Sequence, residues 1–239
     1  TPLYSSAASD VYKRQVVQEI GDWFRQMGNK IMGDAEALFA EEGVEVETRL
    51  VEHADPAETI LQIAKKEGCD LVIMGNRGTG GAEDFLLGGV TEKVSRHIEC
   101  PILIAKEKPK ISKILVAVDG SEYMEKVLAH VMPLATKQKA KITLLNVVQT
   151  SVPWIEPEMV RAGGERILSK AATMAEEMEP NRRLEFGHPA QVILEVAKGE
   201  SSDLIVMGSR GLGQVKRFLL GSVSTRVSRH AHCSVLLVK

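Results

Sequence analysis

The sequence predicts an α/β fold with a doubly wound parallel sheet, present as two tandem copies of which the first is N-terminally truncated. Three observations lead to this prediction. Short continuous apolar runs, such as 114–118 and 204–207, are typical of parallel strands that are buried on both faces. Segments with helical periodicity alternate with these runs. Residues 70–106 also align without a gap on residues 203–239, and 19 of these 37 positions are identical.

The repeat divides the 239 residues into three parts. Residues 1–15 have no hydrophobic period and no signal-peptide core, so we expect a non-native or disordered head there. Residues 16–108 are expected to form an incomplete first domain, without its opening strand, first helix and second strand. Residues 109–239 are expected to form a complete second domain.

The first copy begins with apolar positions at helical spacing over 16–43. Gly28 and Gly33 interrupt this period, which predicts two consecutive helical pieces that stop at Gly43. Residues 44–51 alternate valine with glutamate and predict a strand. The remaining predicted elements are a helix that starts at Asp55-Pro56 and runs through 64, a strand at 71–74, a helix near 90–97 and a closing strand at 102–105.

The second copy supplies a full set of alternating elements. Pro153, Pro157 and Gly163-Gly164 predict an irregular segment over 149–164. The strands are expected at 114–118, 142–148, 183–186, 204–207 and 235–238, and the helices at 121–134, at 165–178, after Pro189 and at 222–231.

A glycine-rich loop follows the strand at 204–207. Gly208 and Gly211 have no Cβ, so their backbone N–H groups can approach a ligand closely. Ser222 stands where an N-cap belongs, and the N-terminus of the following helix would point free N–H groups at the same place. The pattern favours an anion site, although turn glycines and a simple serine cap would produce the same residues.

The spacing of Gly208, Gly211 and Gly221-Ser222 resembles the ATP-binding motif of the universal stress protein family. The second copy matches this motif at every specified position. The first copy repeats it with Gly75, Arg77, Gly78 and Gly88, but Gly89 stands in place of the serine. The resemblance therefore implies a main site in the second copy and a weaker one in the first.

The resemblance also implies a Rossmann-like five-stranded sheet of order 3-2-1-4-5, with the ligand at the point where the strand order reverses. In this family the aspartate after the first strand contacts the nucleoside, a valine near the end of the second strand lies by the adenine, and the glycine motif holds the phosphates. Asp119 could instead be an ordinary turn or cap residue before glycine. The implied binding residues are Asp119, Val147, Gly208, Arg210, Gly211, Gly221, Ser222 and Val223.

Composition indicates which classes of molecule the protein could bind and in which cellular compartment it could lie. A net charge of −2 and a pI near 6.3 do not indicate the basic surface that nucleic-acid-binding proteins usually have, so we expect no nucleic-acid partner. No apolar run approaches the roughly 20 residues that a bilayer requires, so we expect no membrane partner. Three cysteines without CxxC spacing favour a reducing, cytoplasmic compartment.

Two other kinds of site are excluded by spacing. No GxxxxGK[ST] pattern is present, which excludes a P-loop hydrolase as a simple interpretation. His230 and His232 would point apart on a helix, so a metal site at His230-x-His232-Cys233 is not expected.

Three functions remain as hypotheses. The first is a stress-response module that binds ATP or AMP in the second domain, with Mg²⁺ accompanying ATP. The second is slow ATP hydrolysis or phosphotransfer at the same site. The third is a non-binding structural pseudo-dimer. Tandem copies predict an intramolecular pseudo-dimer in any of these cases, because the family commonly pairs through its last strand, here 102–105 and 235–238, and a homodimer is a further possibility.

Overall fold

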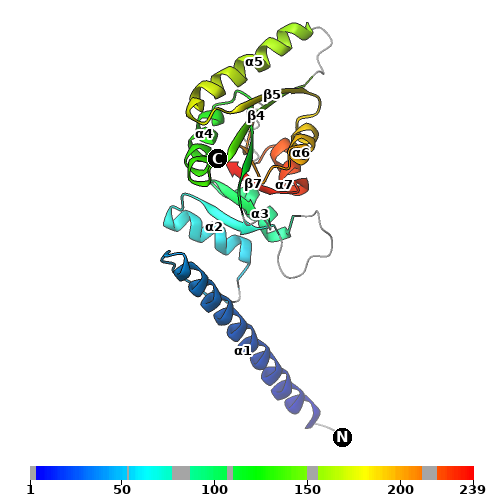
Figure 1. Cartoon of the computed structure of the whole chain (residues 1–239). Helices are drawn as coiled ribbons and strands as arrows, with labels where there is room; N and C mark the ends of the chain where they lie inside the picture. The colour runs from blue at the N-terminus through cyan, green and yellow to red at the C-terminus, as the bar shows by residue number, and fades with distance from the viewer. Residues whose placement is uncertain (1–3, 53, 77–86, 107–109, 150–155, 212–219) are drawn as a thin grey trace. The chain divides into compact units, whose positions relative to one another are not determined.

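The computed structural model describes residues 4–52, 54–76, 87–106, 110–149, 156–211 and 220–239 (Figure 1). The chain divides into two units, residues 1–54 and residues 55–239, each of which is described by itself. No helix among the described residues is long and apolar enough to cross a membrane.

The first unit consists of one long helix and a segment that returns along it. Helix α1 spans Tyr4–Glu41 without a break, so the prediction of two helical pieces over 16–43 is wrong. A glycine inside a helix costs only about 1 kcal/mol relative to alanine, and the helix-forming residues around Gly28 and Gly33 offset that cost. The helix ends as predicted near Gly43, whose φ of 69° permits the turn after it.

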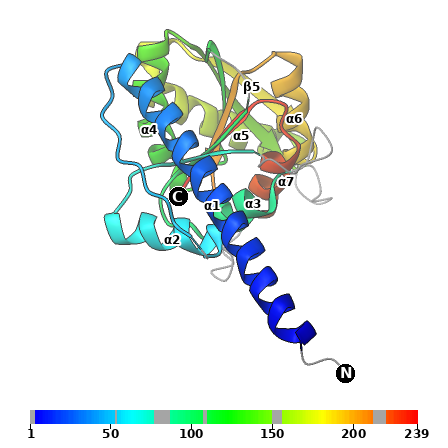
Figure 2. The same ribbon diagram turned by 90° about the horizontal axis from the view of Figure 1, so that it is seen from below.

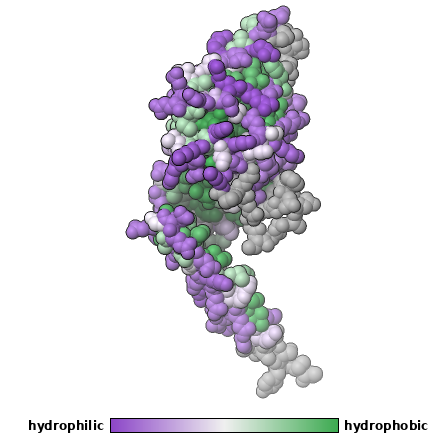
Figure 3. All heavy atoms as spheres, in the orientation of Figure 1, coloured by the Kyte–Doolittle hydropathy of each residue, from purple (hydrophilic) through white to green (hydrophobic). Residues whose placement is uncertain are grey.

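The segment after α1 is not the strand that the alternation over 44–51 predicts. Leu50 instead packs onto α1 at Gly28, where a Cβ would lie 2.6 Å from Leu50 Cδ1. Arg25 Nε donates to Glu52 Oε1 at 2.7 Å. A strand requires a neighbouring strand to complete its hydrogen bonds, and the part of the chain that precedes this segment is helical. Figure 3 shows hydrophobic residues among the hydrophilic ones along α1, and several of them, including Trp23 and Phe24, are more than half exposed.

The second unit contains a single seven-stranded sheet of order β1-β2-β7-β6-β3-β4-β5. All neighbours pair in parallel except β2 and β7, which pair antiparallel. The strands are β1 (Val72–Gly75), β2 (Ile102–Ala105), β3 (Lys113–Ala117), β4 (Lys141–Val148), β5 (Asn181–Phe186), β6 (Leu204–Gly208) and β7 (Ser234–Val238).

The second repeat has the strand order that the sequence resemblance implies. Its five strands follow one another as β5-β4-β3-β6-β7, which is the order 3-2-1-4-5 when they are numbered within the repeat. Among its described residues, the first repeat contributes β1 and β2 to the sheet. The last strands of the two repeats meet as predicted, with Ile102 opposite Leu237 and Ile104 opposite Val235. The two repeats therefore share one mixed sheet rather than forming two separate parallel ones.

Helices cover both faces of this sheet. Buried residues of α2 (Pro56–Glu67), α3 (Gly89–His97), α6 (Pro189–Gly199) and α7 (Ser222–His230) form one core with the strands. Residues of α4 (Tyr123–Gln138) and α5 (Pro157–Met174) form the core on the other face. A short 3₁₀ helix, Glu176–Met178, follows α5. Figures 1 and 2 both show α6 and α7 side by side.

The start of α5 in the second repeat differs from the prediction. Helix α5 begins at Pro157, so Gly163 and Gly164 lie inside it rather than in an irregular segment. Gly164 lets the helix approach the sheet, because a Cβ there would lie 2.4 Å from Leu184 Cδ1 and 2.8 Å from Asn146 Oδ1. Packing thus explains Gly164, one of two adjacent glycines that resembled a loop signal.

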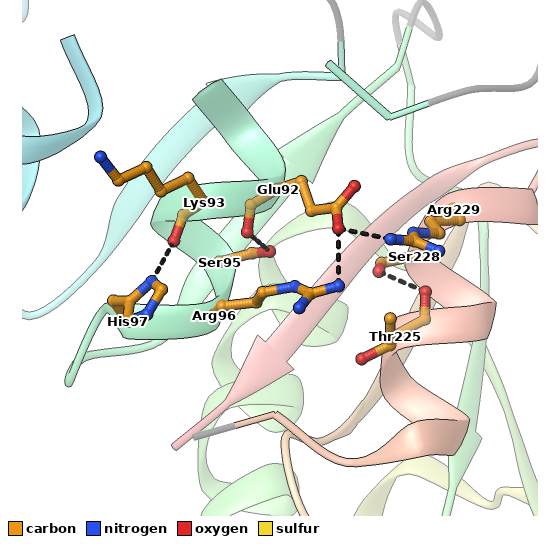
Figure 4. Close-up of polar contacts among 8 residues, drawn as sticks. All are labelled: Glu92, Lys93, Ser95, Arg96, His97, Thr225, Ser228 and Arg229. Carbon is orange, nitrogen blue, oxygen red and sulfur yellow. Dashed lines mark hydrogen bonds and ion pairs between the residues drawn. The ribbon is translucent and has the colours of Figure 1, made fainter. Parts of the chain in front are cut away.

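Charged side chains also connect the two repeats (Figure 4). Glu92 Oε1 on α3 accepts a hydrogen bond from Arg96 Nη2 at 2.7 Å and another from Arg229 Nη2 on α7. Arg96 and Arg229 are equivalent positions of the repeat, whereas the position equivalent to Glu92 is Thr225. One carboxylate therefore lies between two arginines related by the repeat.

Candidate functional site

The candidate site lies where β3 and β6 end side by side. These neighbouring strands are parallel, with Ala117 opposite Met207, so the loops that follow them leave the same edge of the sheet. The strand order reverses at this point, because β4 follows β3 on one side and β6 flanks it on the other. Such a switch point is where open α/β sheets bind ligands.

The loop after β3 is held in a tight turn by its own residues. Asp119 Oδ1 accepts a hydrogen bond from Ser121 N–H at 3.0 Å, which is the turn role considered as the alternative for this aspartate. Gly120 has a φ of 77°, a left-handed conformation that disfavours other residues. The second carboxylate oxygen, Oδ2, points instead toward the loop after β6.

The glycines of the loop after β6 permit close approach. A Cβ on Gly211 would lie 2.6 Å from Asp119 Oδ2, so the two loops touch at this point. A Cβ on Gly208 would lie 2.9 Å from the carbonyl oxygen of Arg210 and 3.1 Å from Tyr123 Cβ. A side chain at either position would therefore collide with neighbouring protein atoms, so this close packing requires glycine.

The start of α7 is fastened to the same loop. Gly221 N–H donates to the Ser209 carbonyl at 2.8 Å, and Ser224 Oγ donates to that carbonyl at 2.8 Å. The N-cap residue is Gly221 rather than Ser222, and it provides no side-chain cap hydrogen bond. Ser222 is exposed in the first turn, so its hydroxyl and the helix N-terminus are available to an anion.

Two buried polar atoms at the site have no hydrogen-bond partner among the described residues. They are Ser121 Oγ and Arg210 Nε, one from each loop. Buried hydroxyl and guanidinium groups normally find partners, and an unmade hydrogen bond costs roughly 1–3 kcal/mol. A ligand with hydroxyl or phosphate oxygens would satisfy both atoms, so the residues present fit a nucleotide.

A second cation lies near Arg210. Half-buried Lys239 follows β7 directly, and its Nζ donates to the Ser95 carbonyl of the first repeat at 2.9 Å. Burial lowers the pKa of Lys239 to about 8, and the positive charge of Arg210 acts in the same direction. Lys239 and Arg210 repel each other electrostatically. An anion bound at this edge of the sheet would offset that repulsion.

The apolar residues implied by the resemblance lie on one face of the sheet. Val147 near the end of β4 and Val223 at the start of α7 are both half-buried against the core formed with α6 and α7. The adjacent residue Asn146 points to the other face, where its Nδ2 donates to the Val118 carbonyl at 2.7 Å. Asn146 thus positions the end of β3 from which the Asp119 loop begins.

The first repeat retains part of this arrangement. Gly88 N–H donates to the Asn76 carbonyl at 2.8 Å, as Gly221 does to Ser209 in the second repeat, and Thr91 Oγ1 donates to the Gly75 carbonyl at 2.8 Å. Arg77 and Gly78 lie outside the described residues. Within the described chain, β1 pairs only with β2, so no strand equivalent to β3 brings an aspartate to this second loop.

Sequence reasoning did not include Ser121, Tyr123, Asn146 and Ser224 among the site residues. Ser224 could have been found from the repeat, because the equivalent position, Thr91, also carries a hydroxyl. Asn146 is a polar residue in an otherwise apolar strand, which is a usable signal for a buried hydrogen bond. Ser121 and Tyr123 carry no signal of this kind, because their roles depend on where the two loops meet.

Comparison with known proteins points to one family. The model of the universal stress protein family matches residues 4–106 and 110–239. Universal stress protein MJ0531 of Methanocaldococcus jannaschii is 35% identical over 139 residues, which are 53% of this chain and 81% of that protein. A universal stress protein of Mycolicibacterium smegmatis is 28% identical over 218 residues, which are 86% of this chain and 72% of that protein.

A solved structure resembles both repeats together. The crystal structure of a universal stress protein from Archaeoglobus fulgidus superimposes with a TM-score of 0.68 at 25% identity, over 91% of this chain and 78% of that one. The family model also matches in two segments, one for each repeat. This chain therefore belongs to the universal stress protein family, with two tandem domains of that family and a fold of nucleotide-binding type.

Proposed function

We propose that this chain is a stress-response module that binds an adenine nucleotide, ATP or AMP, at the loops after β3 and β6. The observation that carries the proposal is the meeting of these loops at the switch point, where Asp119 Oδ2 lies against Gly211. A carboxylate there can accept hydrogen bonds from ribose hydroxyls. The glycine loop and the N-terminus of α7 offer backbone N–H groups to the phosphates.

The other site residues have complementary roles in this proposal. Val147 lies near the base, and Arg210 supplies a positive charge near the phosphates. Gly208, Gly211 and Gly221 keep the loop free of side chains, and Ser222 with Val223 opens the helix that faces the anion. Mg²⁺ would accompany ATP through the phosphate oxygens, because no group of three or more His, Cys, Asp or Glu side chains able to hold a metal occurs in the described part of the chain.

Calorimetric titration of ATP and AMP into the full chain tests the proposal. We expect saturable binding that Asp119→Ala weakens by at least about 10-fold, which corresponds to loss of one charged hydrogen bond. Gly208→Val should abolish binding, because its side chain would meet the Arg210 carbonyl. Glu125→Ala is the matched control, since this exposed acidic residue of α4 lies outside the site and pairs with Lys170.

The outcomes separate the three hypotheses. Stoichiometry near one supports a single site in the second repeat, whereas two sites would show that Gly75, Arg77, Gly78 and Gly88 also hold a nucleotide. Steady release of inorganic phosphate from ATP that is lost in Asp119→Ala would favour the enzyme alternative. Absence of binding by a folded wild-type chain would favour the structural pseudo-dimer.

A further inference from the structure

Two cysteines of the first repeat lie at the same end of neighbouring strands. Cys69 is in the turn between α2 and β1, and Cys100 is in the turn between α3 and β2. The strands are in register with Val72 opposite Ile102, and Val72 N–H donates to the Pro101 carbonyl at 3.0 Å. The segments that precede the two strands therefore run next to each other.

Both thiols are on the same face of the sheet and are partly accessible. Cys69 and Cys100 each pack against the core that includes α2 and α3, and both are half-buried free cysteines. Burial raises the pKa of the Cys100 thiol, Cys69 and Asp70 raise it further through charge, and Lys239 opposes them. The charge effect of Cys69 on Cys100 agrees with the closeness that the strand register requires.

The second repeat lacks this pair. The position equivalent to Cys69 is Ser202, and only Cys233 repeats Cys100. Ser202 and Cys233 are both fully buried, in contrast to the accessible pair. A dithiol at this turn is thus specific to the first repeat, whose outer strand β1 pairs only with β2 in the described chain.

We propose that Cys69 and Cys100 form a redox-active dithiol that closes to an intramolecular disulfide when the chain meets an oxidising low-molecular-weight disulfide. One thiolate attacks a sulfur of oxidised glutathione and releases one glutathione thiolate. The second cysteine thiolate then attacks the mixed disulfide and releases the other. The protein loses two electrons and two thiol protons, and the oxidant is reduced to two glutathione molecules. The bond would fasten β1 to β2 covalently.

Thiol counting on the full chain tests this inference. The reduced chain has three thiols, and after incubation with oxidised glutathione at about pH 9.5, where part of the Cys100 thiol is ionised despite its raised pKa, we expect one. A non-reducing digest should contain a peptide that joins Cys69 to Cys100. Cys69→Ser, which places in the first repeat the residue found at Ser202, should yield no such cross-link.

The controls make the result decisive. Cys233→Ser should form the cross-link as the wild type does, because its thiol is buried in the other repeat. Retention of three thiols in the folded wild type, disulfides that join separate chains, or a cross-link that contains Cys233 would each overturn the inference. The measurement does not depend on nucleotide binding, so it stands or fails separately from the proposed function.

Discussion

At the scale of single residues, the candidate site depends on a few polar atoms that fix where the strands end. Asp119 closes its own turn through Ser121 and leaves its second oxygen against Gly211. Asn146 is buried beneath this turn and donates to the Val118 carbonyl. The orientation of the proposed ligand-binding carboxylate thus depends on an amide in the neighbouring strand.

Asn146→Ala should destabilise the protein by about 1–3 kcal/mol, because it leaves the buried Val118 carbonyl without this donor. It should also weaken ATP binding, since the Asp119 loop begins at the next residue. Urea unfolding followed by circular dichroism measures the first effect and calorimetry the second. Asn181→Ala, at an exposed position of β5, is the matched control and should change neither. Unchanged unfolding of Asn146→Ala would contradict this role.

At the scale of elements, α5 owes its position to a glycine that faces the sheet. Gly163 and Gly164 are adjacent in the helix, but nothing lies within 4 Å of a Cβ on Gly163, whereas a Cβ on Gly164 would meet Leu184, Asn146 and Val148. A side chain could therefore be added at Gly163 without a clash but not at the adjacent Gly164.

Alanine substitutions at these two glycines should change stability in opposite directions. Gly163→Ala should stabilise the protein by about 0.5–1 kcal/mol through helix propensity. Gly164→Ala should destabilise it by about 1–3 kcal/mol, because α5 must move away from β4 and β5. Urea midpoints of the two variants measure this contrast. Equal shifts would show that α5 does not pack as closely as described.

Helix ends also connect the repeats through equivalent lysines. Lys239 Nζ donates to the Ser95 carbonyl near the end of α3, and Lys106 Nζ donates to the Ala231 carbonyl just after α7. Each lysine follows the last strand of its own repeat and reaches the C-terminal end of a helix in the other, where a positive charge is favourable.

Lys239 should make stability rise with pH in the alkaline range. Its folded-state pKa of about 8 lies below the ordinary value of 10.5, so the folded protein releases this proton first and the unfolded chain binds more protons between the two values. Lys239→Met should lack this rise. Urea midpoints for both proteins at about pH 7.5 and 9.5 test the difference, and parallel profiles would contradict it.

At the scale of the whole second unit, the antiparallel β2 and β7 pair joins two domains of one family into a single sheet. Glu92 reinforces this junction by accepting hydrogen bonds from Arg96 and Arg229 (Figure 4). At the far end of the sheet, Ile73 of β1 remains 62% exposed, so apolar surface persists where the first repeat contributes only two strands. Such an edge is a site of unwanted strand pairing.

Glu92→Gln should cost about 1 kcal/mol at neutral pH and nothing at acidic pH. Partial burial opposes the shift, but hydrogen bonds and charge from Arg229 and Arg96 lower the pKa of Glu92 below its ordinary value of 4.5. The stabilisation is therefore present above that value and is lost as pH falls through the lower folded-state pKa. Urea unfolding at about pH 7 and pH 3 measures the effect, with Glu125→Gln as the surface control. A difference that persists at acidic pH would contradict this assignment.

The sequence by itself determined the local and repeated features of this protein. Continuous apolar runs located β3, β4, β6 and β7 of the second repeat, because strands buried on both faces are continuously apolar. The outer strand β5 has no such run and begins at Asn181, two residues before the predicted 183. The repeat and the spacing of Gly208, Gly211 and Gly221-Ser222 predicted a site after β6, and the family resemblance added Asp119 to it. These signals are local, so they can be recognised in the sequence without knowing which other segments each one contacts.

Only the tertiary structure decided which other segments each of these segments packs against. Alternation over 44–51 resembles a strand, yet the segment packs on α1, and the described residues of the first unit contain no strand to complete its hydrogen bonds. Gly163-Gly164 resembles a loop, yet both glycines lie inside α5, and Gly164 is where this helix approaches β4 and β5 closely. The contacts of Asn146 and Lys239 likewise join residues far apart in the chain, so the sequence alone did not identify their partners.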